Sequence, residues 1–123
     1  MKYLCLAYEE EKKLNDLSST EWDSLRQETL AYVEELRHRG CLVSAEPLRS
    51  ARTAATVQVR NGKTTRTDGP FAETREQLGG FFLINARNLE EAIQVASKWP
   101  SARLGTIEVR PIEEGLPVDK RYH

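Results

Sequence analysis

Asp68 and Glu108 are the carboxylates of this chain that we consider first for acid–base chemistry. A carboxylate held in a cleft can exchange a proton with a bound molecule, and Asp68 would then face a cavity as a base or as a ligand contact. Asp68 also begins the run Asp-Gly-Pro-Phe, where an Asp side chain can instead accept backbone N–H groups in a turn. Both roles stay open for Asp68. Phe71, at the end of this run, is expected to anchor the loop in the core.

Further polar and aromatic side chains can line a cavity beside these carboxylates. Glu108 and Arg110 alternate along an expected strand, so they can pair with each other and either bind a small polar or anionic ligand or pack at an interface. Tyr8, at the end of the first strand, can reach the same space. Glu76 lies with Glu73 in a charged segment that is typical of a solvated surface, and two carboxylates three residues apart can also do acid–base work or hold a cation. The candidates for ligand contacts are Tyr8, Asp68, Phe71, Glu76 and Arg110, and the candidates for catalysis are Asp68 and Glu108.

Histidine and cysteine chemistry is sparse in this chain, which has 2 His and 2 Cys. The sequence contains no Walker loop, dinucleotide-binding glycine string, zinc-type spacing or nucleophile elbow, so we expect no metal and no cofactor. His38 lies beside two arginines in the last turn of an expected helix and is predicted at the surface, and His123 is the final residue. Cys5 and Cys41 form no Cys-x-x-Cys pair and are predicted to be free thiols.

The charge of the chain argues against nucleic acid as a partner. The chain has 18 Lys and Arg against 19 Asp and Glu, for a net charge of -1, which gives no basic footprint for nucleic-acid binding. Arg49, Arg52 and Arg60 are scattered along the sequence and are interpreted as a solvated face rather than an anion site. The apolar run over residues 1–8 is too short for a membrane span or a secretion signal, so a cytoplasmic location is expected.

The first part of the chain predicts a central strand followed by a long helix. Residues 2–8 are apolar on both faces, as in a strand at the centre of a sheet. The helix over residues 19–39 is expected to start after Ser18, whose side chain can form a capping box with Glu21. Gly40 then supplies the left-handed conformation at which helices commonly end.

The rest of the chain predicts a hairpin, a glycine-bounded loop, a second helix and further strands. Asn61-Gly62 is a strong hairpin signal, because a type I′ turn needs a positive φ at both central positions. Asn88 is expected to cap the second helix, and Pro100 to end it. The apolar stripe of that helix is predicted to consist of Leu89, Ala92, Ile93, Ala96 and Trp99. The predicted strands cover residues 42–48, 54–60, 63–67, 81–86 and 105–112, and the loop covers 68–80.

This order of elements predicts an α+β fold of the ferredoxin-like βαββαβ type with an inserted β-hairpin. Two helices would cover one face of an antiparallel sheet. The other face carries too many apolar residues to remain in water, so a second copy of the chain is expected to cover it and form a homodimer, sheet against sheet. Residues 1–112 are predicted to form the domain, and residues 113–123 a tail that either crosses to a partner copy or is disordered.

The segment DGPFAETREQLGGFF, from Asp68 to Phe82, resembles the signature of the DGPF-domain proteins of the YCII-related family. The similarity extends over residues 1 to about 112 and includes the Met-Lys-Tyr start, the hairpin and the Ile-Glu-Val-Arg-Pro strand. It implies a bacterial protein with a ferredoxin-like fold and a dimeric α/β barrel, like that of muconolactone isomerase and small monooxygenases. It also implies a sigma factor as a partner, because genes of this family often neighbour those of extracytoplasmic-function sigma factors.

Catalytic relatives in the wider family are thought to use a His–Asp pair, from which this chain departs at both places. The middle of its first helix, residues 27–32, contains no His, and its second helix ends in Lys-Trp-Pro without an Asp before the proline. We therefore expect a homodimer that binds a small molecule or a partner in a regulatory setting. The alternatives are a cofactor-free isomerase, lyase or oxygenase that acts in the dimer cavity, and a protein that associates with a sigma factor.

Overall fold

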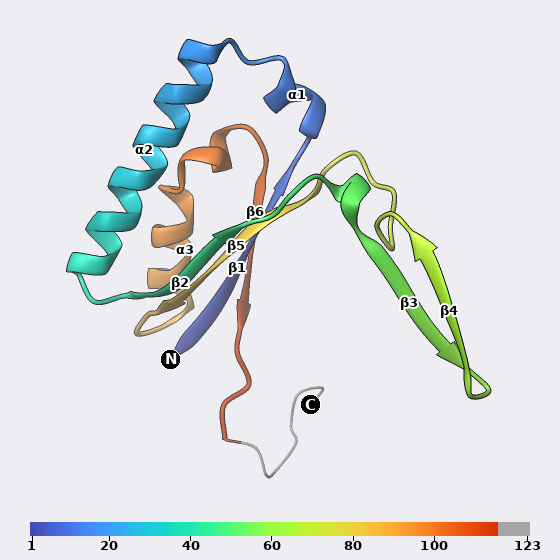
Figure 1. The fold of residues 1–123 in the computed structure, drawn as a ribbon. Helices are drawn as coiled ribbons and strands as arrows, with labels where there is room; N and C mark the ends of the chain where they lie inside the picture. Colours follow the sequence, from blue (N-terminus) through green and yellow to red (C-terminus); the bar gives the residue numbers. More distant parts are fainter. Residues whose placement is uncertain (116–123) are drawn as a thin grey trace.

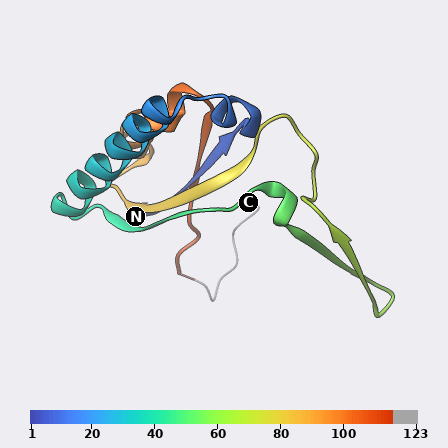
Figure 2. The same cartoon turned by 45° about the horizontal axis from the view of Figure 1, so that its top comes forward.

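A computed structural model describes residues 1–115 as a four-stranded sheet with helices on one face and a separate hairpin (Figure 1). Figure 2 shows that the hairpin extends away from the sheet and its helices. The elements are β1 (Lys2–Glu9), α1 (Glu11–Asn15), α2 (Ser19–His38), β2 (Leu42–Pro47), η1 (Ala51–Thr53), β3 (Ala55–Arg60), β4 (Lys63–Asp68), β5 (Gln77–Asn85), α3 (Leu89–Ser97), η2 (Pro100–Arg103) and β6 (Thr106–Pro111).

The sheet has the strand order β2-β5-β1-β6, and every neighbouring pair is antiparallel. With the β3–β4 hairpin left out, this is the order expected for a ferredoxin-like βαββαβ fold, which confirms the predicted fold class. The pairing of β1 with β5 shifts register between Ala7 and Tyr8, because Ala7 lies opposite Gly80 while Tyr8 lies opposite Leu78. Gly79 is therefore the extra residue of a β-bulge.

The core lies between the sheet and the helices. Alternate residues of β1, namely Tyr3, Cys5 and Ala7, are buried on the helix-facing side together with Phe82 and Ile84 of β5. Trp99 stacks on Phe82, with ring centroids 3.9 Å apart. The Tyr32 hydroxyl of α2 donates a 2.7 Å hydrogen bond to the carbonyl oxygen of Val95 in α3, and this bond joins the two helices above the sheet.

The local signals of the sequence are confirmed. The Glu21 amide donates to Ser18 Oγ at 3.1 Å and the Ser18 amide donates to Glu21 Oε1 at 3.0 Å, which completes the capping box. Gly40 has a φ of 71° directly after α2. Asn61 and Gly62 have φ values of 52° and 73°, as the turn of a two-residue hairpin requires.

Several predicted boundaries are wrong. The short helix α1 was not expected, β5 begins at Gln77 rather than at residue 81, and Asp68 is the last residue of β4 rather than the first of a loop. The strand signal was lost at Gly79 and Gly80, because glycine carries no side chain from which a strand can be recognised. Pro100 does not only end a helix, since it is also the first residue of η2.

The predicted stripe of α3 is confirmed at Ala92, Ala96 and Trp99 and is wrong at Leu89 and Ile93. Leu89 and Ile93 are 45% and 43% exposed, whereas Ala92, Val95 and Ala96 are buried. The buried residues and Trp99 follow one another at spacings of one to four residues that keep them on one face of the helix. Leu89 and Ile93 lie to one side of that face. Small residues on the buried face allow α3 to approach the sheet closely.

Within residues 1–115, no helix covers the other face of the sheet. Leu4 and Leu6 of β1 lie on it opposite Leu83 and Phe81 of β5. On their other side they lie opposite Arg110 and Glu108 of β6. We call these six residues the open face. None of the helices in the described range is long and apolar enough to cross a membrane.

The predicted tail is described only in part. The amide of Ile112 donates to the carbonyl oxygen of Lys2 at 2.9 Å, and the amide of Lys2 donates to Glu114 Oε1 at 3.1 Å. Residues 113–115 therefore stay beside the start of β1. The expectation for residues 116–123, including His123, lies outside the described residues.

Candidate functional site

The first candidate site is a cavity of about 580 Å³ between α2 and the sheet. Its helix wall is formed by Leu25, Thr29 and Val33 of α2, and its floor includes Gly80 and Phe82 of β5. Trp99 closes it on the side of α3. The walls are largely apolar, although Arg26, Glu34, Arg37 and Glu46 also line the cavity. We call this cavity the apolar cleft.

A second cavity of about 560 Å³ adjoins the apolar cleft. It lies among α1, η1 and the start of β5, and its wall includes Arg49, Ser50, Arg52 and Gln77. We call it the polar chamber. The two cavities share four lining residues, Glu9, Leu14, Trp22 and Gly79, and are therefore neighbouring parts of one groove.

Glu9 is the acidic group where the two cavities meet. It continues the helix-facing alternation of β1 beyond Ala7, and it is half-buried. Burial, and to a smaller extent the negative charge of Glu11, raise the pKa of the Glu9 carboxyl above its ordinary value of 4.5. Within residues 1–115, the Glu9 carboxyl has no hydrogen-bond or ion-pair partner. The Glu9 carboxyl is thus free to contact a ligand.

The place of the Glu9 carboxyl depends on Gly79. A β carbon at Gly79 would lie 2.6 Å from Glu9 Cδ and 2.6 Å from Oε2, which is closer than non-bonded atoms approach one another. The missing side chain at the bulge therefore leaves the space that the carboxyl occupies. Gly79 also accepts a 2.8 Å hydrogen bond from the Leu48 amide, so the bulge stays attached to the segment that follows β2.

Glu11 has a structural partner and fixes the wall of the polar chamber. Its carboxylate accepts a 2.9 Å hydrogen bond from the Ala51 amide and a 3.1 Å hydrogen bond from Ser50 Oγ. Ser50 Oγ in turn accepts from the Arg52 amide at 3.2 Å. These bonds join α1 to η1 across a sequence separation of 40 residues.

Arg49 and Arg52 lie on one wall of the polar chamber. Both side chains are exposed, in line with their interpretation as a solvated face, and the turn through η1 brings the two residues to the wall of the same cavity. Arg60, at the end of β3, is exposed and is not part of either wall. The sequence could not show this difference, since it depends on how Glu11 holds η1.

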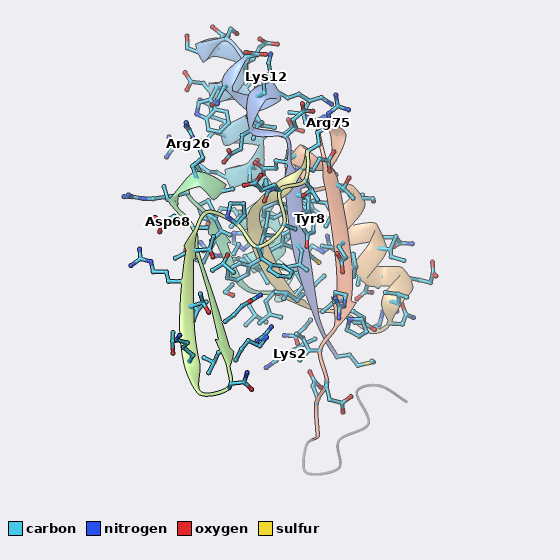
Figure 3. The ribbon with its side chains drawn as sticks, turned by 90° about the vertical axis from the view of Figure 1, so that its right-hand side faces the viewer. Lys2, Tyr8, Lys12, Arg26, Asp68 and Arg75 are labelled. Atoms are coloured by element: carbon cyan, nitrogen blue, oxygen red, sulfur yellow. The ribbon has the colours of Figure 1, made fainter. Side chains whose placement is uncertain are left out.

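The residues predicted for the site are not brought together in these cavities. Asp68 is exposed at the end of β4 and forms a 3.4 Å ion pair with Arg66 of the same strand. Phe71 is 80% exposed, so the expectation that it anchors its loop in the core is wrong. Figure 3 shows Asp68 and Tyr8 on different elements, the hairpin and the sheet. The loop of Phe71 is fixed instead by polar bonds, including those of Gln77 Nε2 to the carbonyl oxygens of Ala72 and Thr74, both at 2.9 Å.

Glu108 and Arg110 form the pair that their spacing predicts, at 3.2 Å, and they do so on the open face, the face that a second copy is expected to cover. Tyr8 lies in the neighbouring strand, opposite Thr106. Glu76 directly precedes β5, and its carbonyl oxygen accepts a 2.6 Å bond from Thr74 Oγ1. None of these four residues lines the apolar cleft or the polar chamber.

The cysteines are free, as predicted, and contribute nothing to the groove. Cys5 is fully buried, and burial raises the pKa of its thiol to about 12, so the reactive thiolate is disfavoured. In the described part of the chain, no three His, Cys, Asp or Glu side chains lie together in a way that could hold a metal ion.

Glu9 is the functional candidate that the sequence did not reveal. Its signal is the two-residue alternation of Tyr3, Cys5, Ala7 and Glu9, which places a carboxylate at the end of a buried stripe. That signal was missed because the strand was expected to end at residue 8.

Comparisons with known proteins show the family of the chain and a solved structure of similar fold. The family model described as the YCII-related domain matches residues 1–115. An uncharacterized protein of Rhizobium meliloti (strain 1021) is 35% identical over 114 residues, which cover 91% of this chain and 92% of that protein. The solved structure of the 5-chloro-2-hydroxyhydroquinone dehydrochlorinase TftG from Burkholderia phenoliruptrix, in complex with 2,5-dihydroxybenzoquinone, is similar with a TM-score of 0.57 and 17% identity. The similarity covers 97% of this chain and 100% of that one.

Proposed function

The chain belongs to the YCII-related domain family, and we propose that it binds a small, largely apolar organic molecule in the apolar cleft between α2 and the sheet. The observation that carries this proposal is a cavity of about 580 Å³ that has mostly apolar walls and a carboxyl of raised pKa at one end. Binding sites for small molecules typically enclose roughly 300–1,000 Å³ and combine such walls with few polar groups. Titratable groups with shifted pKa values gather at functional sites.

The walls favour a flat, ring-containing ligand. Trp99 and Phe82 are stacked at 3.9 Å on the floor and side of the cleft, and Trp22 lies at its other end. Aromatic side chains offer ring faces and edges on which a second ring can pack. The ring compound in the similar dehydrochlorinase, 2,5-dihydroxybenzoquinone, supports this class of ligand by analogy of fold.

Acid–base catalysis at Glu9 is a second candidate function, favoured by the raised pKa of its carboxyl. A carboxyl that keeps its proton to higher pH can donate it to a bound oxygen or leaving group and take it back. In this second proposal the enzyme would act in the cleft, with Glu9 as its acid–base group instead of Asp68, which is exposed and ion-paired. Chloride release from 5-chloro-2-hydroxyhydroquinone by the wild type, but not by Glu9→Gln, would support this second function.

Homodimer formation through the open face remains part of the proposal. Leu4, Leu6, Phe81 and Leu83 make that face apolar at its centre, and the oppositely charged Glu108 and Arg110 lie together at its side. A two-fold axis through such a face lets each copy present the same surface to the other.

A cytoplasmic location, a regulatory setting and association with a sigma factor remain predictions. A pull-down that recovers a sigma factor would support the last of them.

Binding of the neutral fluorescent ring compound N-phenyl-1-naphthylamine tests the proposed cleft. The wild type is expected to bind it with saturable fluorescence enhancement. Val33→Trp, which fills the cleft from α2, is expected to abolish that binding, while Ala31→Trp on the exposed side of the same helix leaves it unchanged. Equal binding by the wild type and by a folded Val33→Trp variant would refute the cleft as the site.

A further inference from the structure

We propose that the polar chamber is an anion subsite, in which Arg49 and Arg52 hold the carboxylate, sulfonate or phosphate group of a ligand whose apolar body lies in the apolar cleft. This inference rests on the proposed function and narrows its ligand class. The ligand would be an amphipathic organic acid.

The two arginines are free to bind an anion. Among the residues that the structure describes, neither guanidinium group forms an ion pair or a hydrogen bond. Each lines the same chamber, three positions apart in the chain. A guanidinium group offers five N–H donors in a planar fork that matches carboxylate and phosphate oxygens.

The backbone that carries these arginines is held at three points. The Leu48 amide donates to the carbonyl oxygen of Gly79 at 2.8 Å, and Glu11 accepts from the Ala51 amide and from Ser50 Oγ. The segment from Leu48 to Arg52 is thus fixed to β5 on one side and to α1 on the other. Less ordering is then needed when an anion binds, which favours affinity.

The charges on the chamber wall favour an anion over a cation. Its charged residues are Glu9, Glu11, Arg49 and Arg52. The Glu11 carboxylate already accepts two hydrogen bonds from η1, and the charged form of Glu9 is disfavoured by burial and by Glu11. The two guanidinium groups are therefore the charges of the wall that are not already engaged and whose charged form is not disfavoured.

The chamber and the cleft are close enough to share one ligand. Glu9, Leu14, Trp22 and Gly79 line both cavities, so a molecule in the cleft can extend past Glu9 into the chamber. Its ring system would contact the apolar walls, and its anionic end would reach the guanidinium groups.

A matched pair of probes separates the two parts of this proposal. The probes are N-phenyl-1-naphthylamine, which is neutral, and 8-anilino-1-naphthalenesulfonate, which has the same ring system with a sulfonate. The wild type is expected to bind the sulfonate more tightly. Arg49→Gln/Arg52→Gln should weaken sulfonate binding roughly tenfold or more, as expected when charge-assisted bonds are lost, and leave binding of the neutral probe unchanged. The control Arg60→Gln, which removes an exposed guanidinium outside both cavities, should change binding of neither probe.

Three outcomes decide between the proposals. If the double variant binds the neutral probe as the wild type does and loses affinity for the sulfonate, the anion subsite is supported. If it binds both probes as the wild type does, the subsite is refuted while the apolar cleft stands. If Val33→Trp does not affect the neutral probe, the cleft is refuted and the subsite with it. Unchanged binding of the neutral probe also shows that the double variant is folded.

Discussion

The Glu9 carboxyl lies against the backbone of Gly79, where a β carbon would be 2.6 Å from it. This contact joins the last residue of β1 to the bulge of β5 and lies where the apolar cleft meets the polar chamber. An acidic side chain is held in a half-buried place because its neighbour has no side chain. The proposed site therefore depends on one glycine as much as on one carboxylate.

Gly79→Ala is expected to move the Glu9 carboxyl and to leave the fold intact. The atoms in the way are the far end of a flexible side chain, so the free energy of unfolding should change by no more than about 1 kcal/mol. The carboxyl would turn toward water, and the Glu9 pKa should fall toward its ordinary value, as read from the carboxyl carbon in an NMR titration. Gly80→Ala provides the contrast. Its β carbon would lie 2.9 Å from the backbone oxygen of Glu46, which should destabilise the fold by about 1–3 kcal/mol. An unchanged Glu9 pKa in Gly79→Ala would contradict the role assigned to Gly79.

Glu9→Gln is expected to become more stable relative to the wild type as the pH rises. The folded-state pKa of Glu9 is raised above 4.5, so the unfolded chain releases this proton first and the folded wild type is progressively disfavoured from about pH 4.5 up to the folded pKa. At lower pH the group is neutral in both states, and the difference between variant and wild type should vanish. Urea unfolding at several pH values across this range measures the difference in the free energy of unfolding between the variant and the wild type.

Glu28→Gln is the matched control with the opposite sign. The bidentate bonds of Arg103, at 2.7 and 2.8 Å, lower the pKa of Glu28. The stability contributed by Glu28 is therefore present above pH 4.5 and is lost as the pH falls through its folded pKa. A pH dependence of the same sign in both variants would show that burial is not what shifts Glu9.

Ser18→Ala is expected to destabilise the protein by about 1 kcal/mol, because it removes one half of the capping box of α2. The loss should appear as a lower urea midpoint with an unchanged slope. Ser19→Ala, at the first position of the helix, is the control and should change stability by less than about 0.5 kcal/mol. Equal effects of the two substitutions would contradict the assignment of Ser18 as the cap.

Leu6→Glu is expected to convert a dimer into monomers of 14.0 kDa. Leu6 lies at the centre of the open face, between Phe81 and Glu108, and an introduced carboxylate would be buried without a partner against a second copy. Sedimentation velocity measures the change, and Leu89→Glu, which alters an exposed residue of α3, should leave the dimer intact. A monomeric wild type, or a dimeric Leu6→Glu variant, would contradict an interface on this face.

The parts of the fold that depend on local chemistry were predictable from the sequence. Ser18 and Glu21 specify the start of α2 because both bonds of the capping box form within one turn. Asn61 and Gly62 specify the hairpin because few residues accept a positive φ. The order of strands and helices follows from such signals and from hydrophobic spacing.

The site was less predictable, because it depends on contacts between distant segments. Nothing in the sequence near Arg49 and Arg52 shows that Glu11 holds their backbone. Asp68 and Phe71 stand out in the sequence, but they lie at the surface of the described chain because the hairpin extends away from the sheet. Glu9 was predictable in principle, since it continues the alternation of β1 by one more residue.

The most direct test of the proposed cleft is to map the binding of N-phenyl-1-naphthylamine on the amide NMR spectrum of the protein. We predict that the largest shift changes fall on the inner side of α2 around Thr29 and Val33, on residues 79–82 of β5 and on Trp99. Changes concentrated instead on Leu4, Leu6 and Leu83 of the open face, or on the β3–β4 hairpin, would contradict the cleft as the binding site.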